Sequence, residues 1–112
     1  MKKILAAGLV ALALSATGSH AFSIDGNRAA VQAMFKGNKS EPTAKDALWT
    51  SPTMFKVGVI DNGSVRDGYA AYVCGEIRDH GIKDSGVMVQ IIDIGQLVRR
   101  DKWVKLGEAV CR

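Results

Sequence analysis

The sequence predicts a single small α+β domain behind an export signal, in the order helix, strand, helix, strand, strand. Two runs rich in β-branched residues, at 54–61 and 86–94, flank a longer run with helical periodicity, and two cysteines can be joined. A chain of 112 residues has room for one domain. We therefore expect a three-stranded mixed sheet, packed on one long helix and closed by one disulfide.

The first 21 residues have the pattern of a bacterial signal peptide. A positively charged start precedes an uncharged run of eleven residues (4–14), and small residues lead up to Ala21. Eleven apolar residues are too few to span a bilayer. We predict cleavage after Ala21. The product begins at Phe22, so it has no cysteine there for a lipid anchor, and we expect it in the periplasm or secreted, without a transmembrane segment.

The signal peptide also accounts for part of the basic composition. The whole chain has 15 Lys and Arg against 11 Asp and Glu, a formal net charge of +4. Removing residues 1–21 takes away two lysines and leaves 13 basic and 11 acidic side chains, a net charge of +2. A dedicated nucleic-acid binder carries a much stronger basic stripe. The composition therefore gives no strong nucleic-acid signal.

The two cysteines, Cys74 and Cys111, are expected to form a structural disulfide. An oxidising compartment favours pairing, and closing the loop of 37 positions between them is worth about 3.9 kcal/mol in chain entropy. A redox pair is usually Cys-X-X-Cys, and a zinc site needs about four ligands. Beyond the signal peptide the chain has only these cysteines and His80, so we expect no metal and no cofactor.

Residues 22–53 are expected to form an N-terminal helix followed by an irregular segment. An apolar stripe predicts a helix at 28–36, capped by Asn27 and ended by Gly37. The stretch that follows contains two prolines and many small polar residues. Within it, residues 43–49 have the capping pattern of one short helical turn.

Residues 54–112 are expected to form a β-α-β-β core. The long helix follows a turn signal, so Asp61 or Ser64 can cap it, and Gly81 ends it. The three strands are all rich in apolar residues. The predicted elements are strands at 54–61, 86–94 and 102–111 and a helix at 65–80.

The lengths of the connections predict the strand directions. A helix of about 24 Å returns the chain to the starting edge, so the first two strands should be parallel. The short link at 95–101 makes the last two antiparallel, with the third strand either at the edge or in the middle. A bulge at Gly107 would turn Cys111 toward the helix. The N-terminal helix is the natural cover for the other face of the sheet, and a partner chain would cover it otherwise.

Asp61 and Asp93 are one candidate site, because they follow the two strands expected to be parallel. Open α/β sheets usually bind ligands at the carboxyl ends of their strands. Two carboxylates there would bind a cation or act as an acid and base pair. The alternative, which we favour, is that Asp61 starts a turn and caps the helix that follows, while Asp93 accepts hydrogen bonds from loop amides near Gly95.

Two other features are candidate interaction surfaces. Arg99, Arg100, Lys102 and Lys105 are interleaved with Trp103, and Arg112 follows at the terminus. This local excess of positive charge suits a polyanion or the acidic face of a protein, or is merely a solvated loop. Gly68, Ala71 and Gly75 share one helix face. Glycine in a helix costs about 1 kcal/mol relative to alanine, so these positions indicate either close approach of a partner or tolerance at an exposed site.

The sequence contains no convincing catalytic constellation. No Ser or Cys has an adjacent base, and no glycine-rich phosphate loop follows a strand. We therefore expect a non-enzymatic exported protein that binds another envelope protein, as an inhibitor, an immunity factor or an assembly accessory. The alternative is a periplasmic protein that binds a small ligand or a cation near Asp61 and Asp93. The sequence does not predict the oligomeric state.

Overall fold

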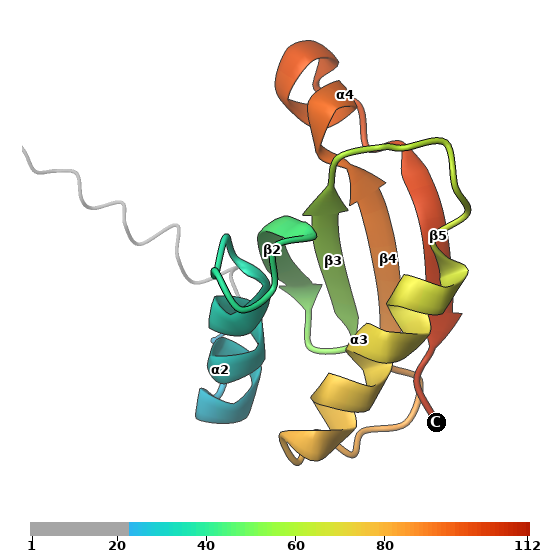
Figure 1. Cartoon of the computed structure of the whole chain (residues 1–112). Helices are drawn as coiled ribbons and strands as arrows, with labels where there is room; N and C mark the ends of the chain where they lie inside the picture. Colours follow the sequence, from blue (N-terminus) through green and yellow to red (C-terminus); the bar gives the residue numbers. More distant parts are fainter. Residues whose placement is uncertain (1–22) are drawn as a thin grey trace, which may run out of the picture.

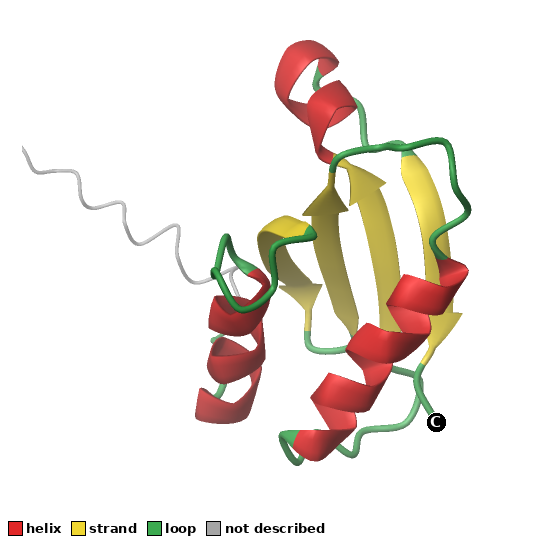
Figure 2. Cartoon of the chain, in the orientation of Figure 1, coloured by secondary structure: helices red, strands yellow, loops and turns green. Residues whose placement is uncertain are grey.

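Three helices and four strands make up residues 23–112, the part of the chain that this computed structural model describes (Figures 1 and 2). The predicted signal peptide at 1–21 lies outside the described residues. In the described part, none of the helices has both the length and the apolar character needed to cross a membrane. In chain order the elements are α2 (Gly26–Phe35), β2 (Ala44–Ser51), β3 (Met54–Val59), α3 (Asp67–Asp79), β4 (Met88–Asp93), α4 (Ile94–Arg100) and β5 (Lys105–Val110).

The strands form one mixed sheet in the order β2-β3-β4-β5. β3 and β4 are parallel, because α3 carries the chain back between them, and β4 and β5 are antiparallel. Both directions confirm the prediction. The order also answers the question that the sequence left open, since β5 lies at an edge of the sheet.

The prediction of a helical turn at 43–49 is wrong, because this segment is the fourth strand, β2. It pairs antiparallel with β3 through a tight connection. Ala47 and Trp49 are buried and Leu48 between them is exposed, so the residues alternate as in a strand covered on one face. The capping pattern was misleading because burial of Trp49 against the sheet outweighs a local preference for one helical turn.

The link at 95–101 is also not a plain loop, because it contains the short helix α4. The Asp93 carboxylate accepts hydrogen bonds from the amides of Gly95 (3.0 Å) and Gln96 (3.2 Å), which caps the first turn. Asp101 ends the helix in a left-handed conformation (φ 55°). None of the seven residues of α4 is buried, and the helix projects beyond the ends of β3 and β4 (Figure 1).

The two longer helices begin at other residues than the sequence indicated. Asp25, and not Asn27, caps α2 by accepting the Arg28 amide at 2.8 Å. α3 starts at Asp67, and the N-cap residue is Arg66, whose side chain makes no capping hydrogen bond. Neither Asp61 nor Ser64 therefore caps the helix as expected. The predicted ends are right, since Gly37 and Gly81 follow the helices with φ of +69° and +82°.

The core lies between one face of the sheet and the helices α2 and α3. Phe35 of α2 is fully buried, and its ring meets those of Phe55, Tyr69 and Tyr72 edge to face at centroid distances of 6.1–6.5 Å. These contacts place α2 on the same side of the sheet as α3 (Figure 1). The expectation that the N-terminal helix covers the opposite face is therefore wrong. The other fully buried large side chains are Val31, Val57, Val59, Ile77, Val73, Val87, Val89 and Ile91.

The predicted disulfide between Cys74 and Cys111 is present and joins α3 to the chain just beyond β5. The register of β5 shifts as the sequence suggested, because Ile91 pairs with Gly107 but Ile92 pairs with Lys105, one residue being left over between them. Gly107 lies against the start of α3. A Cβ there would be 2.3 Å from the carbonyl carbon of Arg66, so glycine is required for this approach.

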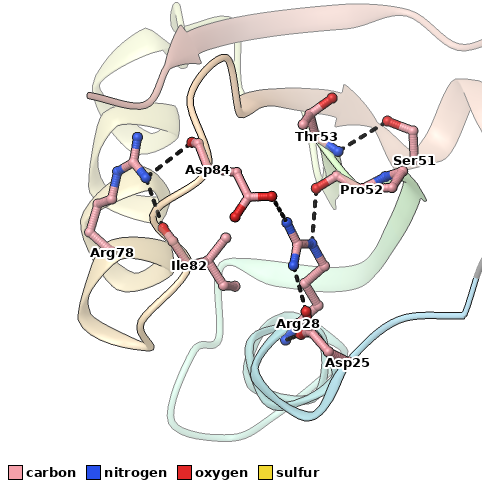
Figure 3. Close-up of polar contacts among 8 residues, drawn as sticks. All are labelled: Asp25, Arg28, Ser51, Pro52, Thr53, Arg78, Ile82 and Asp84. Carbon is pink, nitrogen blue, oxygen red and sulfur yellow. Dashed lines mark hydrogen bonds and ion pairs between the residues drawn. The ribbon is translucent and has the colours of Figure 1, made fainter.

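Arg28 is a buried charged side chain that connects three segments at one end of the sheet (Figure 3). Its guanidinium donates to the Pro52 carbonyl (2.9 Å) and to the carboxylates of Asp25 (2.6 Å) and Asp84 (3.1 Å). It also lies over the Trp49 ring, 5.2 Å from the centroid. Arg28 therefore joins α2 to the β2–β3 connection and to the loop before β4.

Arg78 has a similar role at the end of α3. Its guanidinium donates to the carbonyls of Ile82 (2.8 Å) and Asp84 (3.2 Å) and, across the chain, to those of Cys111 and Arg112 (both 3.0 Å). Asp84 thus contacts Arg78 through its backbone and Arg28 through its side chain (Figure 3). The two arginines hold the loop before β4 from both sides.

We predict that Arg28→Lys and Arg28→Met both lower the free energy of unfolding, by about 2 kcal/mol. The Arg28 guanidinium donates to three acceptors at once, whereas the lysine ammonium cannot reproduce that geometry and methionine has no donor. Asp25 and Asp84 are half-exposed and regain water, which limits the loss. Denaturant unfolding measures the change. Arg100→Met, in the exposed α4, is the control and should be neutral. An equally neutral Arg28→Met would contradict this role.

A second prediction concerns Glu41, which accepts hydrogen bonds from Tyr69 (3.2 Å) and Tyr72, the only tyrosines in the chain. The bond to Glu41 raises the pKa of Tyr72 to about 12, and burial raises the pKa of Tyr69. Both shifts mean that the folded protein holds the tyrosine protons more tightly than the unfolded chain does. The contribution of the two tyrosines to the free energy of unfolding should therefore be constant below about pH 10 and fall as the pH rises toward 12.

The ultraviolet absorbance of tyrosinate reports these two residues alone. Glu41→Gln should move the Tyr72 titration back toward its ordinary pKa, because the charge that opposes tyrosinate is removed. Glu108→Gln, on the opposite face of the sheet, should leave it unchanged. Titration of both tyrosines near pH 10 in the unaltered protein would show that the cluster does not form.

Candidate functional site

The sheet face opposite α2 and α3 is covered by neither of these helices. Phe55, Val57 and Val59 point to the core, so Lys56 and Gly58 between them point the other way. The strand register extends this assignment to the neighbouring strands. We call this surface the open face; its residues include Asp46, Leu48, Lys56, Gly58, Met88, Gln90, Ile92, Lys105, Glu108 and Val110.

A shallow groove of about 70 Å³ lies at the end of the open face nearest to α4. Gly58, in its floor, makes room for the Ile94 side chain, because a Cβ at position 58 would lie 2.8 Å from Cδ1 of Ile94. Ile94 therefore packs directly on the sheet and fixes the start of α4. The groove is lined by Asp46, Ala47, Leu48, Lys56, Gly58, Ile92, Ile94, Leu97 and Trp103.

Two side chains at the groove are both apolar and exposed. Leu48 is 47% exposed and Trp103 is 50% exposed, whereas Ile92 in the floor is buried. Nζ of Lys56 lies 4.9 Å from the centre of the Trp103 ring, a cation–π contact that holds the ring beside the sheet. The sequence drew attention to Trp103 but not to Leu48, Lys56 or Gly58, because their common face depends on how β2 and β3 pair.

The basic patch predicted from the sequence is only partly brought together. Arg100, the last residue of α4, and Lys102 are both exposed and precede Trp103 in the chain. Arg99 turns back along the helix instead, where its Nη1 would be 2.7 Å from a Cβ on Gly95. Arg112 is at the other end of β5, where its carbonyl accepts from Arg78. The basic residues near the groove are therefore Lys56, which lines it, and Arg100 and Lys102, which are close to Trp103 along the chain.

Both edges of the sheet are obstructed by the protein itself. At β5, the Leu106 carbonyl accepts the Arg66 amide (3.0 Å), and the Glu108 amide donates to Asp67 Oδ1 (2.9 Å). At β2, the outward amides of Ala47 and Trp49 donate to the side chains of Asp46 (2.9 Å) and Gln32 (3.3 Å). Edges satisfied in this way are poor templates for an added strand.

Asp61 and Asp93 both lie beyond the carboxyl ends of parallel strands, but each carboxylate is engaged locally. Asp61 accepts the Gly63 amide at 2.9 Å in an exposed turn, and Asp93 caps α4. The turn at Asp61 and the amides on Asp93 agree with the alternative favoured from the sequence, but Asp61 does not cap α3. Across residues 23–112, no three His, Cys, Asp or Glu side chains are grouped so that they would hold a metal ion.

Gly68, Ala71 and Gly75 are exposed along α3, and a Cβ on either glycine would have no atom within 4 Å. Ala71 and Gly75, but not Gly68, line a second hollow of about 270 Å³ between α3 and β5. Nothing in the described part of the chain requires glycine at these two positions. The structure thus removes an intramolecular reason for the glycines and leaves tolerance or a partner.

We predict opposite effects for three glycine-to-alanine substitutions. Gly75→Ala should raise the free energy of unfolding by up to about 1 kcal/mol, and Gly68→Ala by less, because it lies in the first turn of α3. Gly107→Ala should lower it by about 2 kcal/mol or more, since a Cβ would overlap backbone atoms of Arg66. Thermal unfolding compares the three. Stabilisation by Gly107→Ala would disprove the close contact.

Comparison of the chain with protein-family models, with curated proteins and with solved structures finds no match. The open face, the groove and the obstructed edges are therefore the observations from which a function can be inferred.

Proposed function

We propose that this protein is a non-enzymatic protein of the bacterial periplasm that binds another envelope protein through its open face. The observation that carries the proposal is an uncovered sheet face with an apolar groove, next to a projecting helix without buried residues. Exposed apolar side chains that gather on one surface are typical of sites of protein contact. An inhibitor, an immunity factor or an assembly accessory would use such a surface.

The size of the groove supports a protein as the ligand. Pockets for metabolites and cofactors usually enclose roughly 300–1,000 Å³. At about 70 Å³ the groove accommodates the end of a side chain rather than a whole small molecule. Since both sheet edges are obstructed, a partner would lie on the face of the sheet and not extend it by strand addition.

The export of the protein is part of the proposal and rests on the signal-peptide pattern. The disulfide between Cys74 and Cys111 is consistent with it, because such bonds form and persist in oxidising compartments. The alternative function, binding of a cation or a small ligand at Asp61 and Asp93, has less support, because both carboxylates already accept backbone amides.

The proposal predicts that replacing apolar side chains of the groove by uncharged polar ones abolishes retention of a partner. The purified protein is immobilised and exposed to an envelope extract, and Leu48→Gln and Trp103→Gln are compared with the unaltered protein. Both side chains are half-exposed, so folding should be unaffected. Val65→Gln, at a residue 77% exposed before α3, is the matched control and should retain the partner.

Equal retention by the groove variants and the control would contradict the use of the open face. The alternative function has its own signature. Retention of no protein, together with a rise in melting temperature in Ca²⁺ or Mg²⁺ that Asp61→Asn and Asp93→Asn abolish, would replace protein binding by cation binding.

A further inference from the structure

The charges around the groove are unequal, and this inequality indicates the chemistry of the partner. Lys56 lines the groove, and the exposed Arg100 and Lys102 lie in the segment that leads from α4 into Trp103, which also lines it. None of these three side chains forms an ion pair within residues 23–112. Their positive charges are therefore available to a ligand.

Most of the acidic side chains nearby already have partners. Asp46 lies 3.7 Å from Nζ of Lys36, and Glu108 lies 2.8 Å from Nζ of Lys105. The Asp93 carboxylate accepts two amides at the start of α4. Within residues 23–112, Asp61 and Asp67 form no ion pair but accept backbone amides (both 2.9 Å), and Glu41 accepts two tyrosine hydroxyls. Asp101 is therefore the acid of this end with neither an ion pair nor an accepted hydrogen bond in the described part of the chain. The groove is thus an apolar hollow with a positive rim.

Two other occupants fit this arrangement less well. A second copy of the chain in a symmetric contact, groove against groove, would bring Lys56, Arg100 and Lys102 close to the same groups of the first copy, and like charges in contact are unfavourable. A membrane surface would meet a concave site whose exposed Leu48 and Trp103 form the walls of a hollow. Membrane-binding helices instead present a continuous apolar face to the lipid.

We propose that the groove binds an acidic peptide segment of a partner protein, with one apolar side chain between Leu48 and Trp103. Glu or Asp residues next to that side chain meet Lys56, Arg100 and Lys102. This inference rests on the proposed function, since it assumes a protein ligand on the open face, and it adds the chemistry that the ligand must have.

The test uses three sets of synthetic ten-residue peptides, each with one central Leu or Phe. The flanking residues are Glu and Asp in the first set, Gln and Asn in the second, and Lys and Arg in the third. Binding is followed by tryptophan fluorescence, which is informative because Trp49 is buried and Trp103 is half-exposed. Members of the acidic set should shift the emission to shorter wavelength, more weakly at high salt, and Trp103→Gln should abolish the shift.

Charge reversal at the rim provides the matched comparison. Arg100→Glu with Lys102→Glu should weaken binding of the acidic peptides by roughly tenfold, because two attractive pairs become repulsive. Lys39→Glu with Lys83→Glu makes the same change of net charge at exposed positions away from the groove, and it should change the affinity by less than about twofold.

Several outcomes would overturn the inference. These are equal binding of neutral peptides, preference for basic ones, or no binding of any acidic peptide at millimolar concentration. Binding to vesicles of anionic lipid without binding to acidic peptides would show a membrane ligand, and a concentration-dependent dimer blocked by Leu48→Gln would show a second copy. If an extract partner is lost with Leu48→Gln but kept by Arg100→Glu with Lys102→Glu, the inference fails while the proposed function stands.

Discussion

The close contact between α3 and β5 is the constraint on which the rest of the structure depends. At the start of α3 the backbone of Arg66 touches Gly107, where no larger residue fits, and the Asp67 carboxylate accepts the Glu108 amide. The disulfide from the middle of the helix and the Arg78 guanidinium near its end hold α3 to the residues that follow β5. Because α3 is fixed at both ends, it covers one face of the sheet, and it also blocks the edge at β5.

The same constraint decides where a ligand would bind. α2 completes the covered side by burying Phe35 beside α3, and Arg28 secures it to two loops. Both longer helices therefore pack on the same face of the sheet. On the open face, only α4 of the described helices packs against the strands, through Ile94. Trp103 and Leu48 both line the groove there, although the two are far apart in the sequence. The proposed binding surface is thus a consequence of how the core is packed.

Much of the central β-α-β-β order could be predicted, because long apolar runs and strong helix stops are local signals. Two elements could not. β2 is a half-buried edge strand whose polar residues and flanking prolines suggest a loop, and only its pairing with β3 makes it a strand. α4 buries no residue, so it has no apolar stripe to reveal it. The groove was missed for the same reason, since β2 and α4 supply most of its walls.

By itself, the sequence determined the features that depend on residue type and local spacing. These are the α+β class, the glycine stops of the helices, the parallel and antiparallel strand directions, and the pairing of the two cysteines. Only the tertiary structure decided which face of the sheet α2 covers, where β5 lies and which basic residues meet at the groove. Those outcomes depend on contacts between segments distant in the chain, such as Phe35 with Phe55 and Lys56 with Trp103, and such contacts have no local signature.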